Sequence, residues 1–237
     1  MKILAIDSSG LVAGVAVAEG DTLLAEYTTN YKKTHSQTLL PMLDEVKRMI
    51  ELDLSSIDAI AVAAGPGSFT GLRIGSATAK GLGLALDKPL IGVPTVDALA
   101  MNLYGAGGYI CPIMDARRNQ VYAAFYMWEN DKLIRLTDHM AESIERVIEI
   151  AEMLEQEVIF LGDGVPVHRE RLEQNPAFLF APAHCNMQRA SAVAALGAIM
   201  AEEGLAKPGN AFELIYLRKS QAEREREARL AKEEAGE

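Results

Sequence analysis

The chain has 237 residues, 49% of them hydrophobic and 24% charged, and a formal net charge of −10. This composition predicts a globular protein with a sizeable core and excludes a disordered chain. The acidic balance argues against a protein that grips nucleic acid by itself, because phosphate binding rests largely on clustered Lys and Arg.

Targeting and redox features place the chain in the cytosol. No apolar run approaches the ~20 residues that cross a bilayer. The first residues lack the basic start and cleavage site of a signal peptide and instead predict a strand. Cys111 and Cys185 lie far apart in the sequence, so an exported disulfide scaffold is not indicated. We expect a cytosolic protein without a membrane partner.

The chain opens with a predicted three-stranded meander. Ile3 to Ile6 forms an apolar strand that ends in Asp7, and a second strand follows through Val12, Val15 and Val17. A tight turn at residues 19–21 leads to a third strand over residues 22–28. Asp7 at the strand end has two interpretations: a turn residue that bonds its own backbone, or a ligand for a metal–nucleotide complex.

A helix is predicted after this meander. Thr34 and Gln37 fit a capping box, which places His35 in the first helical turn. Apolar residues then recur at helical spacing and include Leu39 and Leu43. Pro41 leaves two alternatives open, a kinked helix or a regular part that begins near Pro41.

The next segment is a glycine loop, GPGSFTGLRIG over residues 65–75, between a predicted buried strand and a helix that begins near Ser68. Such loops bring backbone N–H groups close to a phosphate or to another backbone. The Walker pattern fails because Leu72 and Arg73 stand where Lys and Ser or Thr are needed. The dinucleotide pattern fails because Thr70 replaces its third glycine. Ser68 is predicted to cap the helix.

The helix that follows is rich in small residues. Gly81 and Gly83 each cost about 0.5–1 kcal/mol relative to alanine. Interior glycines have a packing reason when backbones approach closely. Two explanations stay open, a docking face for another helix and burial against the chain's own sheet.

The second half repeats the first. A strand over residues 110–114 ends in Asp115, a second strand runs through Val121 to Phe125, and a tight turn at residues 129–131 precedes a third strand over residues 132–136. Neither Asp7-Ser8-Ser9 nor Asp115-Ala116-Arg117 has the glycine that lets a backbone approach a pyrophosphate. The paired loss predicts two degenerate phosphate turns.

The sequence offers no catalytic set. Its four histidines are His35, His139, His168 and His184, and no two are three or four residues apart, so no helix can present a His pair to a metal. The loop around Ser68 does not match Gly-x-Ser-x-Gly, and no His and acid are placed beside it by a recognisable pattern. We therefore predict no catalytic residues and no metal site.

Several segments together resemble the TsaB (YeaZ) family of tRNA threonylcarbamoyladenosine biosynthesis. They are the opening MKILAIDSS, the glycine loop, THSQTLLP at residues 34–41, MDARRNQVYAAFY at residues 114–126, GDG around Asp163, and IYLR at residues 215–218. The resemblance therefore covers nearly the whole chain.

The resemblance implies an α/β protein of two tandem actin-like (ribonuclease H-like) domains, each with a mixed sheet that starts in a three-stranded antiparallel meander. The expected boundaries are residues 1–105 and 106–218, followed by a charged helical or disordered tail at residues 219–237. Candidate nucleotide contacts are Asp7, Gly67, Ser68 and Arg73. The expected partner interface consists of Leu39, Leu43, Leu72, Gly75, Ala79 and Gly83.

By the same resemblance the chain is a non-catalytic subunit that supports a TsaD-like catalytic subunit in threonylcarbamoyl transfer to the adenosine beside the anticodon. A TsaE-like ATPase is a further expected partner, and a homodimer is possible. The chain is expected to bind no cofactor alone, ATP only within the complex, and tRNA only through it. The alternatives are an ATP-dependent kinase or ATPase of the same fold, and a self-associating binding module.

Overall fold

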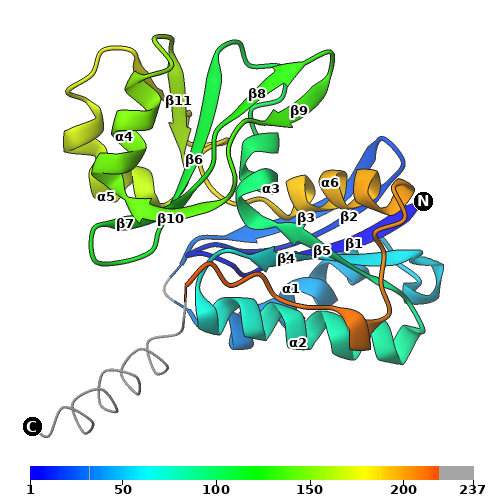
Figure 1. The fold of residues 1–237 in the computed structure, drawn as a ribbon. Coiled ribbons are helices and arrows are strands. Elements are labelled where there is room, and N and C mark those ends of the chain that lie inside the picture. Colours follow the sequence, from blue (N-terminus) through cyan, green and yellow to red (C-terminus); the bar gives the residue numbers. More distant parts are fainter. Residues whose placement is uncertain (32, 219–237) are drawn as a thin grey trace, which may run out of the picture.

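The chain forms two mixed sheets, each flanked by helices, in a computed structural model that describes residues 1–31 and 33–218 (Figure 1). The predicted tail at residues 219–237 lies outside the described residues. The boundary between the two predicted domains, near residue 105, falls between α3 (Thr95–Met101) and β6 (Tyr109–Asp115). Where the domains should be divided stays a prediction.

The first sheet has the strand order β3-β2-β1-β4-β5. Its strands are β1 (Lys2–Asp7), β2 (Ala13–Glu19), β3 (Thr22–Thr29), β4 (Ala59–Gly65) and β5 (Leu90–Pro94). The first three pair antiparallel and confirm the predicted meander, whereas β4 and β5 add in parallel. Every residue of β4 is buried, as expected for a central parallel strand covered on both faces.

The second sheet repeats this order as β10-β7-β6-β11-β12, with a β8–β9 hairpin beside it. Its further strands are β7 (Gln120–Ala123), β8 (Tyr126–Glu129), β9 (Lys132–Arg135), β10 (Met140–Ser143), β11 (Val158–Leu161) and β12 (Phe178–Phe180). β6 and β11 run parallel and so do β11 and β12, while β6, β7 and β10 form the antiparallel meander.

The third strand of this second meander was predicted wrongly. The strand that pairs with β7 is β10, not residues 132–136. Ala124 and Phe125 are fully buried and fall between β7 and β8, which interrupts the second strand. After this break β8 pairs with β9, and the turn at Asn130 and Asp131 has the positive φ angles that such hairpins demand. The extra hairpin is therefore an insertion in the duplicated pattern.

The helices cover the faces of the two sheets. They are α1 (His35–Met49), α2 (Phe69–Leu86), α3, α4 (Ile144–Glu152), α5 (Gly164–Leu172) and α6 (Ala190–Glu202), with short 3₁₀ turns at Leu54–Ser56 and Gly209–Ala211. α1 and α2 pack on one face of the first sheet, and α4 and α5 pack on the second sheet (Figure 1).

The two remaining helices are exchanged between the halves. α6 comes from the second half, yet its Ala190, Val193 and Ala194 pack on the first sheet. α3 comes from the first half, yet its Val96 and Leu99 pack against β6 and β11 of the second sheet. The two helices also contact each other between the sheets. Each sheet therefore depends on the other half for part of its core.

A carboxylate of the first half caps α6. Glu26 in β3 accepts hydrogen bonds from the Ser191 backbone N–H (3.0 Å) and the Ser191 hydroxyl (2.8 Å), and it forms an ion pair with Arg189. Burial opposes ionisation, yet the hydrogen bonds from Arg189 and Ser191 outweigh it and lower the pKa of Glu26. This contact joins the edge of the first sheet to the start of the exchanged helix.

α1 begins at the residue that the capping pattern indicated, but without the predicted side-chain cap. Thr34 is the N-cap residue and makes no side-chain capping bond, and the Gln37 N–H instead donates to the Thr34 carbonyl. Pro41 lies inside the helix, which continues to Met49. The alternative in which the regular helix begins near Pro41 is therefore wrong.

The predicted partner-interface residues face the chain's own core, so this prediction is wrong for the residues it named. All six are buried in the structure: Leu39, Leu43, Leu72, Gly75, Ala79 and Gly83. Leu39 and Leu43 belong to α1, and the other four belong to α2. The small residues among the four let α2 approach the first sheet closely. A Cβ on Gly83 would lie 3.0 Å from the Lys88 carbonyl oxygen and 3.0 Å from the Leu90 side chain.

The two helix glycines therefore predict opposite mutational effects. Gly81 is exposed and a Cβ there would meet nothing within 4 Å, so Gly81→Ala should raise the free energy of unfolding by about 0.5–1 kcal/mol. Ala79 is 0% exposed, so Ala79→Glu buries an unpaired charge and should cost about 3–5 kcal/mol. Urea unfolding of the two variants checks both values, and an unchanged midpoint for Ala79→Glu would show that this face is not core.

Candidate functional site

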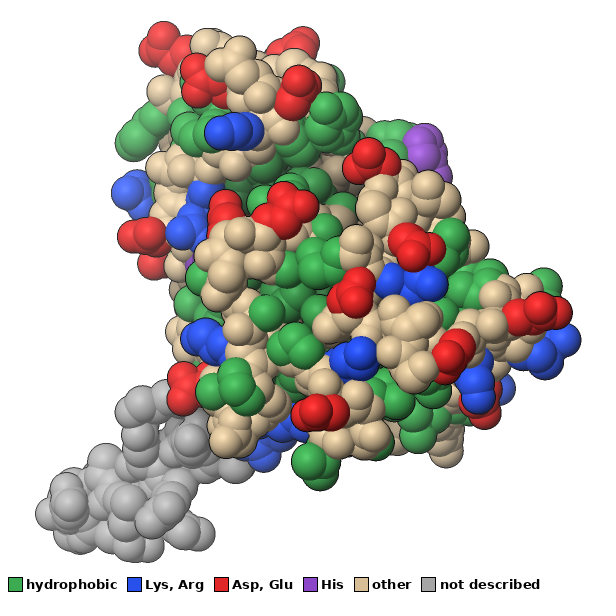
Figure 2. Space-filling view, turned by 90° about the vertical axis from the view of Figure 1, so that its right-hand side faces the viewer, with side chains coloured by type: hydrophobic (Ala, Val, Ile, Leu, Met, Phe, Trp, Pro, Cys, Tyr) green, Lys and Arg blue, Asp and Glu red, His purple; other side chains and the backbone are tan. Residues whose placement is uncertain are grey.

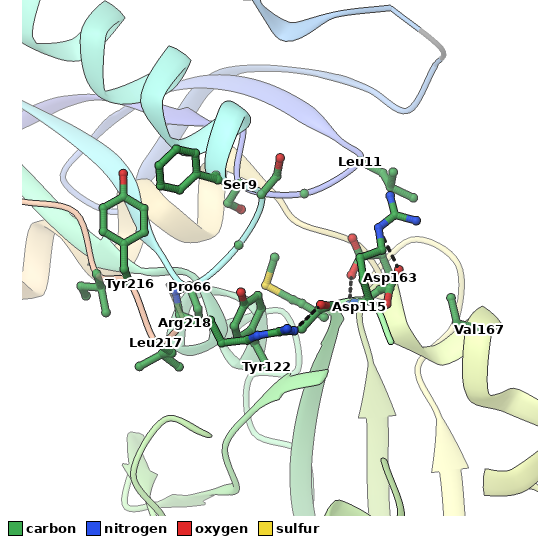
Figure 3. A pocket seen from close by; sticks show the side chains of 18 residues that line it. Ser9, Leu11, Pro66, Asp115, Tyr122, Asp163, Val167, Tyr216, Leu217 and Arg218 are labelled. Carbon is green, nitrogen blue, oxygen red and sulfur yellow. Dashed lines mark hydrogen bonds and ion pairs between the residues drawn. The ribbon is translucent and has the colours of Figure 1, made fainter. Parts of the chain in front are cut away.

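A cleft of about 490 Å³ lies where the strand-end turns of the two halves meet. Its walls come from four segments: the β1–β2 turn, the glycine loop before α2, the β6–β7 turn, and the chain end at residues 215–218 (Figure 3). Tyr122 from β7, Asp163 from the loop after β11 and Val167 from α5 complete the lining. The halves therefore form the cleft together.

The two strand-end aspartates adopt the same local geometry. The Asp7 Oδ1 accepts a hydrogen bond from the Ser9 N–H at 2.8 Å, and the Asp115 Oδ1 accepts one from the Arg117 N–H at 2.8 Å. Asp7 also accepts the Ser9 hydroxyl at 2.6 Å, and its burial raises its pKa. The interpretation of Asp7 as a turn residue that bonds its own backbone is therefore confirmed, and the duplication extends to individual hydrogen bonds.

The glycine loop packs directly on the first of these turns. The Ser68 N–H donates to the Ser9 carbonyl at 2.7 Å, and the Ser8 hydroxyl donates to the Gly71 carbonyl at 2.9 Å. A Cβ on Gly67 would collide with the Ser9 carbonyl oxygen, and one on Gly71 would collide with the Ser8 carbonyl oxygen. These glycines therefore allow one backbone to approach another, and the Ser68 N–H is used in a bond within the chain.

The start of α2 is capped as the sequence predicted. The Ser68 side chain accepts a hydrogen bond from the Gly71 N–H at 3.3 Å. Arg73, one turn further on, places its guanidinium 3.9 Å from the centre of the Phe69 ring. Of the four candidate nucleotide contacts, Asp7, Gly67 and Ser68 are thus engaged within the chain, and Arg73 lies on an aromatic ring of the cleft wall.

Asp163 is the buried acid of the site. Its Oδ1 accepts a hydrogen bond from the Asp115 N–H at 3.0 Å, so it joins the loop after β11 to the end of β6. Burial is the main reason that its pKa rises to about 6, and the nearby Asp115 charge adds to the rise. Backbone hydrogen bonds from Asp115 and Leu11 oppose it.

The chain end at residues 212–218 crosses the cleft from one half to the other. The Ile215 N–H donates to the Ala64 carbonyl at 2.8 Å, the Tyr216 ring lies 5.1 Å from the Phe69 ring, and Arg218 donates to the Ala116 carbonyl at 2.6 Å (Figure 3). Sequence reasoning assigned this segment no site residue. The IYLR motif at residues 215–218 was the only sequence feature that pointed to this segment. Its residues show no hydrophobic periodicity that would predict a place at the cleft.

The β6–β7 turn is strained. Arg117, Arg118 and Asn119 have φ values of +65°, +56° and +60°, a conformation that non-glycine residues rarely adopt. Asn119 holds the turn in place, because its side chain donates to both oxygens of Glu145 at 2.8 Å and accepts from Arg171. The neighbouring Arg117 side chain is 84% exposed.

The histidines do not gather at the cleft. His35 forms a 2.9 Å hydrogen bond with the Gly10 carbonyl, His139 lies 2.5 Å from Asp97, and His168 is buried beside the β6–β7 turn. Within residues 1–31 and 33–218, no three His, Cys, Asp or Glu side chains are grouped as a metal would require. A search of the same residues found no helix both long and apolar enough to span a membrane.

Comparisons with known proteins agree with this geometry. Residues 22–225 match a family model described as TsaD: tRNA N6-adenosine threonylcarbamoyltransferase. The tRNA threonylcarbamoyladenosine biosynthesis protein TsaB of Bacillus subtilis is 36% identical over 173 residues, which cover 73% of this chain and 76% of that protein. The chain belongs to the TsaB family.

Further relatives extend the family match. TsaB of Escherichia coli is 37% identical over 53% of this chain and 55% of its own length, so that alignment spans about half of either protein. The crystal structure titled YeaZ from Pseudomonas aeruginosa superposes with a TM-score of 0.77 at 25% identity, over 91% of this chain and 99% of that one. The superposition includes both sheets, which agrees with one fold for the whole described chain.

The raised pKa of Asp163 predicts a pH effect on stability in this TsaB-family chain. Between pH 3.8 and about 6 the folded state holds more protons at this site than the unfolded state, so stability falls as pH rises through this range. At pH 7 the ionised group costs about 2–3 kcal/mol. Asp163→Asn keeps an oxygen for the Asp115 N–H and should recover this amount.

Chemical unfolding at several pH values measures the effect. The difference between Asp163→Asn and the unsubstituted chain should be near zero at pH 4 and should grow until pH 6 to 7. Taking the difference cancels the contributions of the other acids, among them Asp7, whose pKa is also raised by burial. A difference that stays constant with pH would mean that Asp163 has an ordinary pKa.

Proposed function

We propose that the chain is a non-catalytic subunit of the machinery that makes threonylcarbamoyladenosine in tRNA, and that it supports a TsaD-like catalytic subunit. The observation that carries the proposal is the closed backbone contact in the cleft of a TsaB-family chain. The Ser68 N–H and the loop glycines Gly67 and Gly71 are engaged with the β1–β2 turn, so they are not free to cradle a phosphate. This supports a binding role over the alternative of an ATP-dependent kinase.

The proposed fold is a tandem pair of actin-like domains. Both halves repeat one order of elements, which supports this fold. In each half three meander strands are followed by a helix, a strand, a helix, a strand and a helix. The matching turns at Asp7 and Asp115 add a second, independent repeat. In such a pair the cleft between the halves is where a nucleotide would bind, and in this chain ATP is proposed to act only within the complex.

The partner is proposed to dock on the outer side of α2. Gly81 and Ala85 are exposed there and carry little side-chain volume, so a second helix can approach the backbone. Leu84 is 87% exposed on the same side, the most exposed large hydrophobic residue among those described. The proposal takes Leu84 as the apolar anchor of this contact, with the small residues on either side giving a second helix room to approach. This face replaces the inward-facing residues that the sequence suggested.

Recruitment of tRNA is proposed to occur through the complex. The net charge of −10 gives the isolated chain little phosphate affinity. Figure 2 shows one face on which basic side chains are scattered among acidic ones rather than gathered. A TsaE-like ATPase is the other proposed member of the assembly. Without its partners the chain is proposed to form a homodimer through the outer face of α2. Its proposed location is the cytosol.

The docking proposal predicts the behaviour of Leu84→Arg. The added charge and volume should abolish co-purification with a TsaD-like subunit, while the melting temperature stays within about 2 °C because the side chain touches little of its own chain. Met153→Arg is the matched control, since Met153 is 71% exposed at the end of α4 in the other half.

A pull-down with both proteins co-expressed reads out the result. Co-purification by the unsubstituted chain and by Met153→Arg, but not by Leu84→Arg, supports the docking face. Retained assembly of Leu84→Arg would exclude this face of α2. Failure of the unsubstituted chain to co-purify with any TsaD-like subunit, or to restore the modified nucleoside in cells that lack their own TsaB, would contradict the proposed function itself.

A further inference from the structure

Arginines of this chain divide into two groups by their partners. Seven of the ten arginines in the described residues lie within 4.0 Å of a carboxylate oxygen. The other three, Arg73, Arg118 and Arg218, have no carboxylate of the described residues at that distance. In an acidic chain with many carboxylates available, three arginines without one are an exception that calls for a reason.

All three lie around the same cleft. Arg218 lines it, and Arg73 stacks on Phe69, which also lines it. Arg118 lines the hollow directly beside it, and Arg117 belongs to both cavities. We add Arg117, which is paired with Asp115, to the three arginines that have no carboxylate partner. We call this set of four, Arg73, Arg117, Arg118 and Arg218, the arginine rim. The rim brings together residues from α2, the β6–β7 turn and the chain end.

The β6–β7 turn, which carries Arg117 and Arg118 of the rim, has a strained backbone conformation. Arg117 and Arg118 are two of three consecutive residues in the left-handed region, a conformation that is unfavourable for residues with a Cβ. The ties of Asn119 to Glu145 and Arg171 keep the turn in this conformation. Both arginine side chains are exposed as a result, and strain of this kind is typical of binding segments.

Aromatic rings accompany the positive charge. Phe69 and Tyr216 form a pair with ring centres 5.1 Å apart, and Tyr216 is 44% exposed. Tyr122 lies on the opposite wall, below Arg218 (Figure 3). Guanidinium groups contact phosphates, and exposed rings stack on bases without selecting among them. Charge and rings together fit a single-stranded nucleic acid segment.

The acids of the cleft do not cancel this rim. Asp163 is 8% exposed, so its carboxylate lies beneath the surface, where it accepts a hydrogen bond from the Asp115 N–H. Asp115 accepts a hydrogen bond from the Arg117 N–H through its Oδ1, and its Oδ2 lies 3.7 Å from the Arg117 Nε, so this acid offsets the charge of Arg117 alone among the four rim arginines. Glu170 is the exposed acid that shares the hollow of Arg118. A mononucleotide is not favoured, because the Ser68 N–H and the loop glycines that could cradle its phosphates already pack against the β1–β2 turn.

We propose that the arginine rim contacts the phosphodiester backbone of single-stranded RNA in the assembled complex, with the Phe69–Tyr216 pair stacking a base. The inference rests on the proposed function, because a few arginines cannot hold tRNA on a chain of net charge −10. The rim adds contacts to RNA that the catalytic partner holds. It gives this subunit a direct part in substrate binding beyond supporting its partner.

The test uses the complex of the full chain with its TsaD-like partner and measures tRNA affinity across a range of salt concentrations. Each lost phosphate contact reduces the slope of log affinity against log salt by about 0.7–1. The triple variant Arg73→Gln, Arg118→Gln, Arg218→Gln should therefore lower the slope by about 2. Arg48→Gln, Arg146→Gln, Arg169→Gln is the matched control, because it removes the same charge from carboxylate-paired arginines elsewhere.

A second variant separates stacking from charge. Tyr216→Ala should lower affinity about 5- to 150-fold, the fold-change for one lost base–aromatic stack, and leave the salt slope unchanged. Equal slopes for the rim variant and the matched control would overturn the proposal. Release of the RNA by millimolar free AMP would also overturn it, since the site would then recognise a mononucleotide.

Complex assembly and the melting temperature are measured together with tRNA affinity. These measurements distinguish a failure of the RNA-contact proposal from a failure of the proposed function. An intact complex with unchanged tRNA binding by the rim variant rejects the RNA contact and leaves the proposed function standing. A rim variant that melts normally but no longer assembles assigns the arginines to partner docking and rejects the RNA contact. An unsubstituted chain that never assembles with the partner rejects the proposed function.

Discussion

The structure depends on one backbone-to-backbone contact, between the β1–β2 turn and the glycine loop before α2. Gly67 and Gly71 lack the Cβ atoms that would collide with the Ser9 and Ser8 carbonyl oxygens, and the Ser68 N–H donates to Ser9. The contact fixes the start of α2 on the first sheet and places Phe69 at the cleft. It also engages the Ser68 N–H and the loop glycines in packing within the chain.

Helix exchange makes the two halves interdependent. α6 supplies part of the core on the first sheet and is capped there by Glu26, while α3 packs on the second sheet. The chain end adds a third link through Ile215, Tyr216 and Arg218. These links join the two walls of the cleft.

Local patterns in the sequence were enough for most of the fold. Apolar runs placed the first meander, and the repeated strand–aspartate pattern revealed the duplication. The third strand of the second meander was missed because Ala124 and Phe125 continue the apolar run of β7, and only burial in three dimensions shows that the ladder breaks there. The interface residues were missed for a related reason. Small residues recur on both sides of α2, so spacing alone could not show which side faces the sheet.

Parts of the site were beyond sequence reasoning because they combine distant segments. Nothing in the sequence brings Arg218 to Ala116 or aligns Tyr216 with Phe69. The strained conformation of Arg117 and Arg118 was also hidden, because glycine is the usual signal for a positive φ and none is present. The role of Asp7 was one of two stated alternatives, and a hydrogen bond to its own backbone decided it.

The central claim, that the glycine loop packs on the β1–β2 turn and is not free to bind a phosphate, is tested most directly by titration calorimetry of the isolated chain with Mg-ATP. The account predicts no binding heat up to about millimolar nucleotide, a level at which affinity is worth only about 4 kcal/mol. Micromolar binding of Mg-ATP that is lost in Asp7→Ala, with an unchanged melting temperature, would contradict the account. It would show that the isolated chain binds nucleotide through Asp7.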